Sequence, residues 1–85
     1  MHTVYVIKSD AFNRIYIGTT EDVNTRLAQH NAGKTRSTKP YCPWRQIYSE
    51  TFEDKSEALR RERQIKQSGL IRNALRNEDY RGPIV

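Results

Sequence analysis

Two segments predict the fold of this chain: Thr3-Val-Tyr-Val-Ile-Lys8 and Arg14-Ile-Tyr-Ile-Gly-Thr19. Both are rich in β-branched and aromatic residues, which is typical of strands. The short connection between them favours an antiparallel hairpin. Apolar side chains alternate onto both faces of each strand, and a hairpin that is apolar on both sides needs cover on both sides. We therefore expect helices to pack against each face of the sheet.

The remainder of the 85-residue chain supplies those helices and one more strand. The expected elements are a helix over 21–31, a strand over 44–52, a helix over 56–66 and a short helix over 70–76. Their expected N-caps are Thr20, Asp54, which Glu57 complements three residues later, and Ser68. The prediction is an α+β domain with a small, three-stranded, mostly antiparallel sheet flanked by helices, in the order β-β-α-β-α-α. Residues 1–77 would form this domain, and 78–85 a C-terminal tail.

The basic residues of the chain, whose net charge is +5, are concentrated in two segments. Residues 23–49 contain five basic residues and no acidic one, and 58–77 contain six basic residues with Glu62 as the only acid. This distribution suggests a polyanionic partner, nucleic acid first. A solvated basic surface explains the charge alone equally well. The loop 34–43 is basic and rich in hydroxyl groups, which suits phosphate contact. The candidate nucleic-acid-binding residues are Lys34, Arg36, Thr38, Lys39, Arg45 and Lys66.

Composition also excludes several classes of protein. Cys42 is the single cysteine, so intramolecular disulfides and cysteine-based zinc sites are excluded. No apolar run approaches the length that spans a membrane, and the N-terminus starts directly with a strand pattern instead of a signal peptide. We expect a cytoplasmic domain with no membrane partner.

Glu62 is the unusual residue of the predicted helix 56–66. On a helical wheel, Ala58, Leu59 and Ile65 form one apolar stripe, with Glu62 in its middle and Lys66 on its edge one turn later. Burying an ionised carboxylate is costly unless the group is paired or binds a metal. Glu62 is therefore either in a structural ion pair with an arginine across the core or part of a functional site.

The preceding elements carry further candidates. Arg26 and His30 are four residues apart on the helix 21–31 and share one face. Arg26 can offer a bidentate fork to a phosphate, or it is a surface cation; His30 can also simply cover the core. Tyr5 and Tyr16 can share one face of the hairpin, where packing alone would explain them. Gly18 weakens a strand, so we expect it to allow a bend or a close approach.

In their order along the chain, Tyr5, Tyr16-Ile17-Gly18, Arg26, His30 and Glu62 resemble the motifs of the GIY-YIG nuclease superfamily. The first motif reads Val-Tyr-Val at 4–6 instead of Gly-Ile-Tyr, and it keeps the tyrosine. Further strings resemble the small stand-alone members of that superfamily: His30-Asn31-Ala32-Gly33, Thr38-Lys39, Pro43-Trp44, and Ala58-Leu59-Arg60-Arg61-Glu62 followed by Ile65-Lys66. The resemblance runs from Val4 to about Lys66.

This resemblance implies metal-dependent hydrolysis of DNA phosphodiester bonds. By the same resemblance, Glu62 would hold one Mg²⁺ or Mn²⁺ ion, and Arg26 would steady the scissile phosphate. Tyr5 and Tyr16 would position or deprotonate the attacking water, with His30 near the nucleophile. The implied chemistry agrees with the residue types, because cleavage needs an activated water, a metal and stabilisation of charge at phosphorus.

Three functions are consistent with this sequence. The first is an endonuclease, structure-specific or acting in DNA repair or recombination. The second is a nucleic-acid-binding module of the same fold with little or no turnover, and the third is a protein-interaction module in which Glu62 is structural. In larger superfamily members an appended domain supplies target choice, so a homodimer or a protein partner would supply specificity here.

Overall fold

The computed structural model describes residues 1–79, and residues 80–85 lie outside the described part. The elements are strands β1 (His2–Ser9), β2 (Ile15–Thr20) and β3 (Trp44–Phe52), helices α1 (Val23–Asn31), α2 (Lys55–Gln67) and α3 (Gly69–Arg76), and the short 3₁₀ helix η1 (Lys39–Tyr41). This confirms the predicted order β-β-α-β-α-α. It also confirms an α+β architecture with a single three-stranded sheet.

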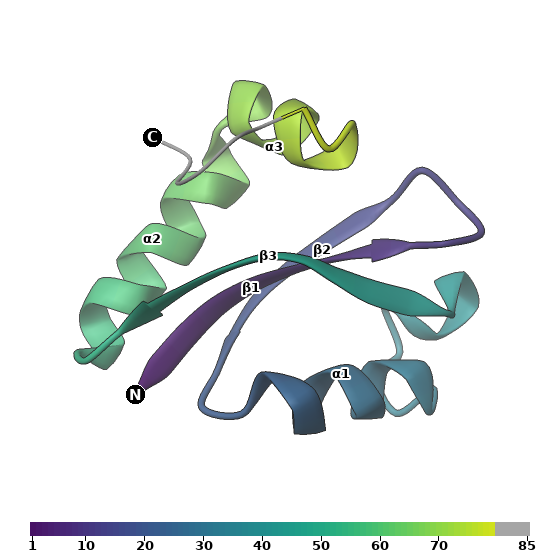
Figure 1. The fold of residues 1–85 in the computed structure, drawn as a ribbon, viewed down its shortest axis with the longest axis horizontal. Coiled ribbons are helices and arrows are strands. Elements are labelled where there is room, and N and C mark those ends of the chain that lie inside the picture. Colours follow the sequence, from purple (N-terminus) through teal and green to yellow (C-terminus); the bar gives the residue numbers. More distant parts are fainter. Residues whose placement is uncertain (80–85) are drawn as a thin grey trace.

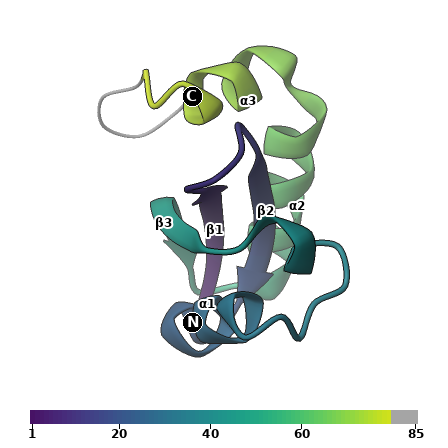
Figure 2. The same ribbon diagram turned by 90° about the vertical axis from the view of Figure 1, so that its right-hand side faces the viewer.

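The sheet has the strand order β2-β1-β3, and both pairings are antiparallel. Figure 2 shows β1 between its two neighbours, so that β2 and β3 form the edges. In the register of the hairpin, Tyr5 lies opposite Gly18. The pairing with β3 shifts by one residue after Val6, which leaves Ile47 as a bulge.

Helices cover both faces of the sheet, as the hairpin pattern predicts. In Figure 1, α1 lies below the sheet, and α2 and α3 lie above it. On the side of α2 and α3, Val4 and Val6 pack with Ile65 in one buried cluster. On the side of α1, Tyr5 and Ile7 pack with Trp44, Val23 and Leu27 in another. Side chains that alternate along β1 therefore belong to two thin cores, one on each face of the sheet.

Two of the three predicted N-caps are confirmed. The Asp54 carboxylate accepts a hydrogen bond from the Ser56 backbone N–H at 3.0 Å, and the Ser68 hydroxyl accepts one from the Ile71 N–H at 3.1 Å. The prediction of Thr20 as N-cap of the first helix is wrong. Thr20 remains in β2, paired with Thr3, and Asp22 caps α1 by accepting from the Thr25 N–H at 3.1 Å.

The predicted loop 34–43 contains η1 and is tied to the sheet at Trp44. The Asn31 side chain accepts from the Trp44 backbone N–H at 2.6 Å and donates to the Trp44 carbonyl at 3.0 Å. The Trp44 indole Nε1–H donates to the Thr38 carbonyl at 2.9 Å. These bonds fix the loop against the end of α1, and they involve side chains at both ends of the connection.

The predicted tail begins with a residue that contacts the domain. Glu78 accepts hydrogen bonds from Arg45 Nη1 and Nη2 at 2.8 and 2.7 Å. The rest of the predicted tail, 80–85, lies outside the described residues, and the domain boundary after residue 77 stays a prediction. Within residues 1–79, every helix is too short or too polar to cross a membrane.

The packing of α3 can be tested by replacing leucine with alanine at a buried and at an exposed position of this helix. Leu75 is fully buried against the sheet, whereas Leu70 on the same helix is 84% exposed. We expect Leu75→Ala to lower the free energy of unfolding by about 2–5 kcal/mol. The control variant Leu70→Ala should change it by less than about 0.5 kcal/mol. Urea denaturation followed by circular dichroism measures both values, and equal effects would contradict the packing of α3.

Candidate active site

The Tyr5 side chain crosses the neighbouring strand at Gly18. The two residues lie directly opposite in the register, and a Cβ atom on residue 18 would lie 2.6 Å from the Tyr5 hydroxyl and 2.8 Å from its Cζ. The close approach predicted for Gly18 is therefore confirmed. Because the strand offers no side chain there, the Tyr5 hydroxyl reaches α1 and lies 2.9 Å from His30 Nε2.

His30 is the centre of a buried hydrogen-bonded chain. Its Nδ1 lies 2.8 Å from the Thr38 hydroxyl, which donates to the Thr35 carbonyl at 3.3 Å. His30, Tyr5 and Thr38 are all buried. Since the Thr38 proton is used on Thr35, the pattern assigns a proton to Nδ1 of His30 and makes Nε2 the acceptor for the Tyr5 hydroxyl. His30 is thus held neutral and in a fixed orientation.

Arg26 places a positive charge beside this chain. Its guanidinium interacts with the Tyr5 hydroxyl, which raises the pKa of Arg26, and Tyr16 contributes in the same direction. Burial raises the pKa of Tyr5, and Arg26 opposes that shift. Burial also lowers the pKa of His30, with Arg26 as the second cause. The Tyr16 ring packs on His30 with 4.8 Å between ring centroids, and its centroid lies 6.2 Å from that of Tyr5.

Glu62 lies on the opposite face of the sheet, on α2. Its Oε1 accepts from the Thr19 hydroxyl at 2.5 Å, and its Oε2 accepts from Lys66 Nζ at 2.9 Å. The cationic partner of Glu62 is thus a lysine one turn along its own helix instead of an arginine across the core. The Glu62 side chain is 20% exposed.

The apolar stripe of α2 is narrower than the sequence predicts. Ala58 and Ile65 are fully buried, but Leu59 is 40% exposed. The prediction that Leu59 belongs to the buried stripe is therefore wrong. Glu62 lies at the border of the buried face instead of its middle, which leaves its carboxylate within reach of solvent and ligands.

β2 is an edge strand, and side chains from both faces of the sheet lie along its open edge. Along this strand, Tyr16 faces α1, whereas Ile17 packs toward α2, and Thr19 shares the orientation of Ile17. Tyr16 and Arg26 therefore approach the edge from one face, and Glu62 approaches from the other. The Glu62 carboxylate is close enough to contribute to the raised pKa of Tyr5.

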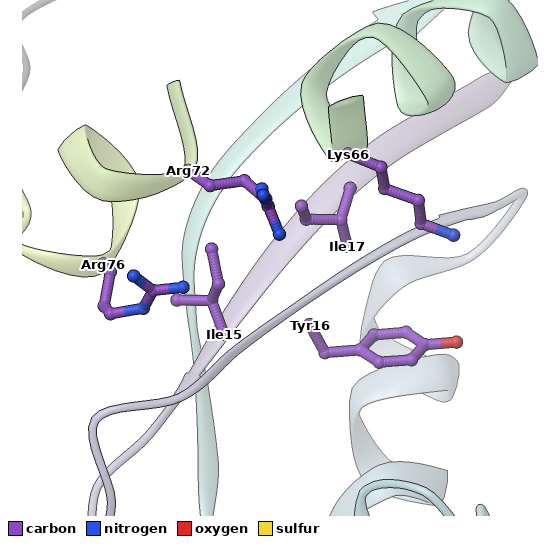
Figure 3. Close-up of a pocket in the computed structure, with 6 residues that line it drawn as sticks. All are labelled: Ile15, Tyr16, Ile17, Lys66, Arg72 and Arg76. Atoms are coloured by element: carbon purple, nitrogen blue, oxygen red, sulfur yellow. The ribbon is translucent and has the colours of Figure 1, made fainter. Parts of the chain in front are cut away.

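A pocket of about 260 Å³ opens at this edge. Figure 3 shows the residues that line it, which belong to β2, α2 and α3. They are Ile15, Tyr16, Ile17, Lys66, Arg72 and Arg76.

The candidate nucleic-acid-binding residues are in different environments. Lys34, Arg36 and Lys39 are exposed on the segment after α1, and their contact with nucleic acid stays a prediction. Thr38 is buried and binds His30, so it is positioned to orient that histidine. Arg45 lies on β3, the other edge strand, in ion pairs with Asp10 and Glu78. The structure thus places Lys66 near the candidate catalytic residues and separates Arg45 from them.

The donor set at Glu62 fits a hydrated divalent cation. Within the described residues, no group of three or more His, Cys, Asp or Glu side chains is gathered as a metal cage would require. Mg²⁺ keeps several of its waters and binds through one or two carboxylates. Each Glu62 oxygen has one described hydrogen-bond partner, and a carboxylate oxygen has lone pairs for a second.

Three residues at the site are not among the sequence-based candidates: Thr19, Arg72 and Arg76. Thr19 follows Ile17 by two residues, so strand alternation places it on the face of α2. The spacing of Arg72 and Arg76 by four residues puts them on one side of α3. These periodicities were visible in the sequence, but the packing partner of each face was not.

The close approach of Tyr5 to Gly18 predicts that alanine destabilises the protein at position 18 but not at position 69. Gly18→Ala should reduce the free energy of unfolding by roughly 1–3 kcal/mol, because the new methyl group overlaps the buried Tyr5 ring. Gly69→Ala is the matched control, since nothing lies within 4 Å of the added Cβ, and it should be neutral or stabilising. Thermal unfolding of both variants compares them. Similar losses at the two positions would contradict the close approach.

His30 predicts a pH dependence of stability. Its pKa in the folded protein lies below the ordinary value of 6.5, so the unfolded chain binds this proton at a higher pH than the folded protein does. The contribution of His30 is fully present above pH 6.5 and is lost as the pH falls toward its folded-state pKa. We expect His30→Gln to lose less stability than the unmodified chain between about pH 7.5 and about pH 5 in urea titrations. An NMR titration of His30 with its midpoint at or above 6.5 would contradict this.

Comparison with known proteins identifies the family of this chain. Residues 1–72 match the family model described as the GIY-YIG catalytic domain. A UPF0213 protein of Staphylococcus haemolyticus is 47% identical over 66 residues, which cover 76% of this chain and 79% of that protein. A UPF0213 protein of Halobacterium salinarum is 48% identical over 69 residues, covering 79% and 87%.

A solved structure shares the fold. The solution NMR structure of a UPF0213 protein from Bacillus halodurans aligns with a TM-score of 0.54 and 30% identity, over 92% of this chain and 84% of that one. The family match extends across Tyr5, Tyr16, Arg26, His30 and Glu62. This chain therefore belongs to the GIY-YIG family, whose members are nuclease-like catalytic domains.

Proposed function

We propose that this protein is a divalent-metal-dependent endonuclease that hydrolyses phosphodiester bonds in DNA. One observation carries the proposal: Arg26 lies beside the Tyr16 hydroxyl on one face of β2, and the partly exposed Glu62 side chain reaches the same edge strand from the other face. The family match supports the class of reaction, and the basic segments of the sequence support the class of substrate.

Arg26 is proposed to hold the scissile phosphate. A guanidinium can offer two parallel hydrogen bonds to phosphate oxygens, and it offsets the negative charge that the pentavalent transition state spreads over them. Arg26 lies half-buried beside the hydroxyls of Tyr5 and Tyr16. The partial burial strengthens its interaction with an incoming anion relative to that of a fully solvated cation.

Glu62 is proposed to hold Mg²⁺ or Mn²⁺. When bound, such an ion acts as a Lewis acid on the phosphoryl oxygen and on a coordinated water. Thr19 orients the carboxylate by donating to Oε1, which is the role that outer hydrogen-bond partners play at metal sites. Lys66 balances part of the negative charge of Glu62 through Oε2.

Tyr16 is proposed as the tyrosine that contacts the attacking water. Tyr16 lines the pocket, whereas the Tyr5 hydroxyl is buried and hydrogen-bonded to His30 Nε2. Burial also raises the pKa of Tyr5, which disfavours its use as a base. Tyr5 and His30 would then be positioning residues that hold the Tyr16 ring and Arg26 in place.

The test is cleavage of labelled single-stranded, duplex, flapped and branched DNA with Mg²⁺, Mn²⁺ or EDTA. Glu62→Gln keeps the shape of the side chain and removes its charge, so it should lower metal-dependent cleavage by at least about a hundredfold while DNA binding persists. Glu57→Gln is the matched control, because it removes an exposed carboxylate from the first turn of the same helix. It should cut like the unmodified chain.

Other outcomes would select among the alternatives. Equal cutting by both variants would indicate a contaminating nuclease and remove Glu62 as the metal ligand. Salt-sensitive DNA binding without cutting would favour a binding module. Neither binding nor cutting, with a loss of stability in Glu62→Gln, would favour a protein-interaction module in which Glu62 is structural.

A further inference from the structure

The pocket at the edge of β2 has a charge that its own lining does not balance. Its lining contains three cationic side chains, Lys66, Arg72 and Arg76, and no acidic one. Lys66 is paired with Glu62. Within residues 1–79, neither Arg72 nor Arg76 has a described ion pair, and Arg76 donates only to the neutral side chain of Asn73, at 2.9 Å. The sequence of residues 80–85 contains no Asp or Glu side chain.

Two arginines outside the pocket, one on β3 and one on α2, do have acidic partners. Arg45 is paired with Asp10 and Glu78, and Arg61 with Glu50. By contrast, Arg72 and Arg76 are like charges four residues apart on α3, which costs an isolated helix a few tenths of a kcal/mol. An anion placed between them would remove that cost. The arrangement therefore has the features of an anion-binding site.

The shape of the pocket indicates a particular kind of anion. Figure 3 shows Arg72 and Arg76 extending from α3 beside Ile15 and Ile17 of β2, with Lys66 on α2. Cations that face an apolar floor suit a ligand with a charged group and an uncharged body. A nucleotide unit has both, since its phosphate is anionic and its sugar presents a largely apolar face.

The position of the pocket connects it to the proposed active site. Tyr16 forms one wall, and Lys66 donates to Glu62 at 2.9 Å. We propose that this pocket binds a second phosphodiester group of the substrate strand, adjacent to the phosphate that is cleaved. Arg72 and Arg76 bind its oxygens, and Ile15 and Ile17 contact the sugar. The inference rests on the proposed function in that both place the DNA strand along the edge of β2.

The proposal gives α3 a role in substrate binding. Arg26 on α1 holds the strand on one side of β2, and the two arginines of α3 hold it on the other. Two phosphate-binding sites on one DNA strand fix the position of the scissile phosphate better than one site does. Such positioning is a large part of the catalysis of phosphoryl transfer.

The first test uses the salt dependence of DNA binding in EDTA, where no cleavage occurs. In Arg72→Gln/Arg76→Gln, the slope of log K against log salt should become shallower by about 0.7–0.9 for each phosphate that the variant no longer neutralises. The matched control is Arg60→Gln/Arg63→Gln, which removes two exposed arginines from α2 outside the pocket lining. It should leave the slope within error of the unmodified chain. Equal slopes for the two double variants would overturn the proposal.

The second test changes the DNA instead of relying on the protein variant alone. A set of oligonucleotides carries one neutral methylphosphonate in place of one phosphate, moved along the strand. The unmodified chain should lose affinity at one position beside the cleaved bond, and Arg72→Gln/Arg76→Gln should be indifferent to that position alone. The same loss in both proteins would overturn the proposal.

These results separate the pocket from the nuclease proposal. If cleavage depends on Glu62 but both double variants bind alike, the pocket inference fails and the nuclease stands. If Glu62→Gln cuts normally but Arg72→Gln/Arg76→Gln shows the altered slope, the nuclease assignment of Glu62 fails and the phosphate site stands.

Discussion

The close passage of Tyr5 over Gly18 sets the geometry of the whole site. Position 18 offers no side chain, so the Tyr5 ring extends across β2 and its hydroxyl meets His30 on α1. His30 in turn holds Thr38, and the Thr38 carbonyl holds the indole of Trp44 at the start of β3. Because Gly18 has no Cβ, this series of hydrogen bonds can connect the hairpin, α1 and β3.

The hydrogen-bond network of Tyr5, His30 and Thr38 also explains how a thin core can contain buried polar groups. Within the described residues, every buried side-chain nitrogen or oxygen has a hydrogen-bond partner. Removing one partner of a buried polar group costs about 1–3 kcal/mol, which is a large share of the stability of a small domain. The network therefore allows one relative arrangement of Tyr5, His30 and Thr38, and it holds the partly exposed Tyr16 ring against a rigid surface.

An edge strand is the structural reason that a site can form from both faces of the sheet. A central strand would separate Tyr16 and Arg26 from Glu62 by a complete layer of backbone. At β2 the sheet ends, and side chains from α1 and α2 can approach the same ligand around that edge. Open edges invite pairing with other chains, and here the edge is bordered by the charged residues Lys66, Arg72 and Arg76.

The sequence alone was sufficient for the order of helices and strands and for the two-sided cover of the hairpin, because these follow from local periodicity. The order of its motifs was sufficient for the family. The sequence misplaced the cap of α1, since Thr20 and Asp22 are both good caps and only strand pairing retains Thr20 in β2. It listed Thr38 among the nucleic-acid-binding residues of the loop, because loop composition does not reveal a buried hydroxyl that bonds to His30. The meeting of Tyr16, Arg26 and Glu62 at one edge, and of Arg72 and Arg76 beside them, came from tertiary packing. The residues that line the pocket lie up to 61 positions apart in the sequence (Ile15 and Arg76), and no local pattern specifies which helix face will lie against which strand.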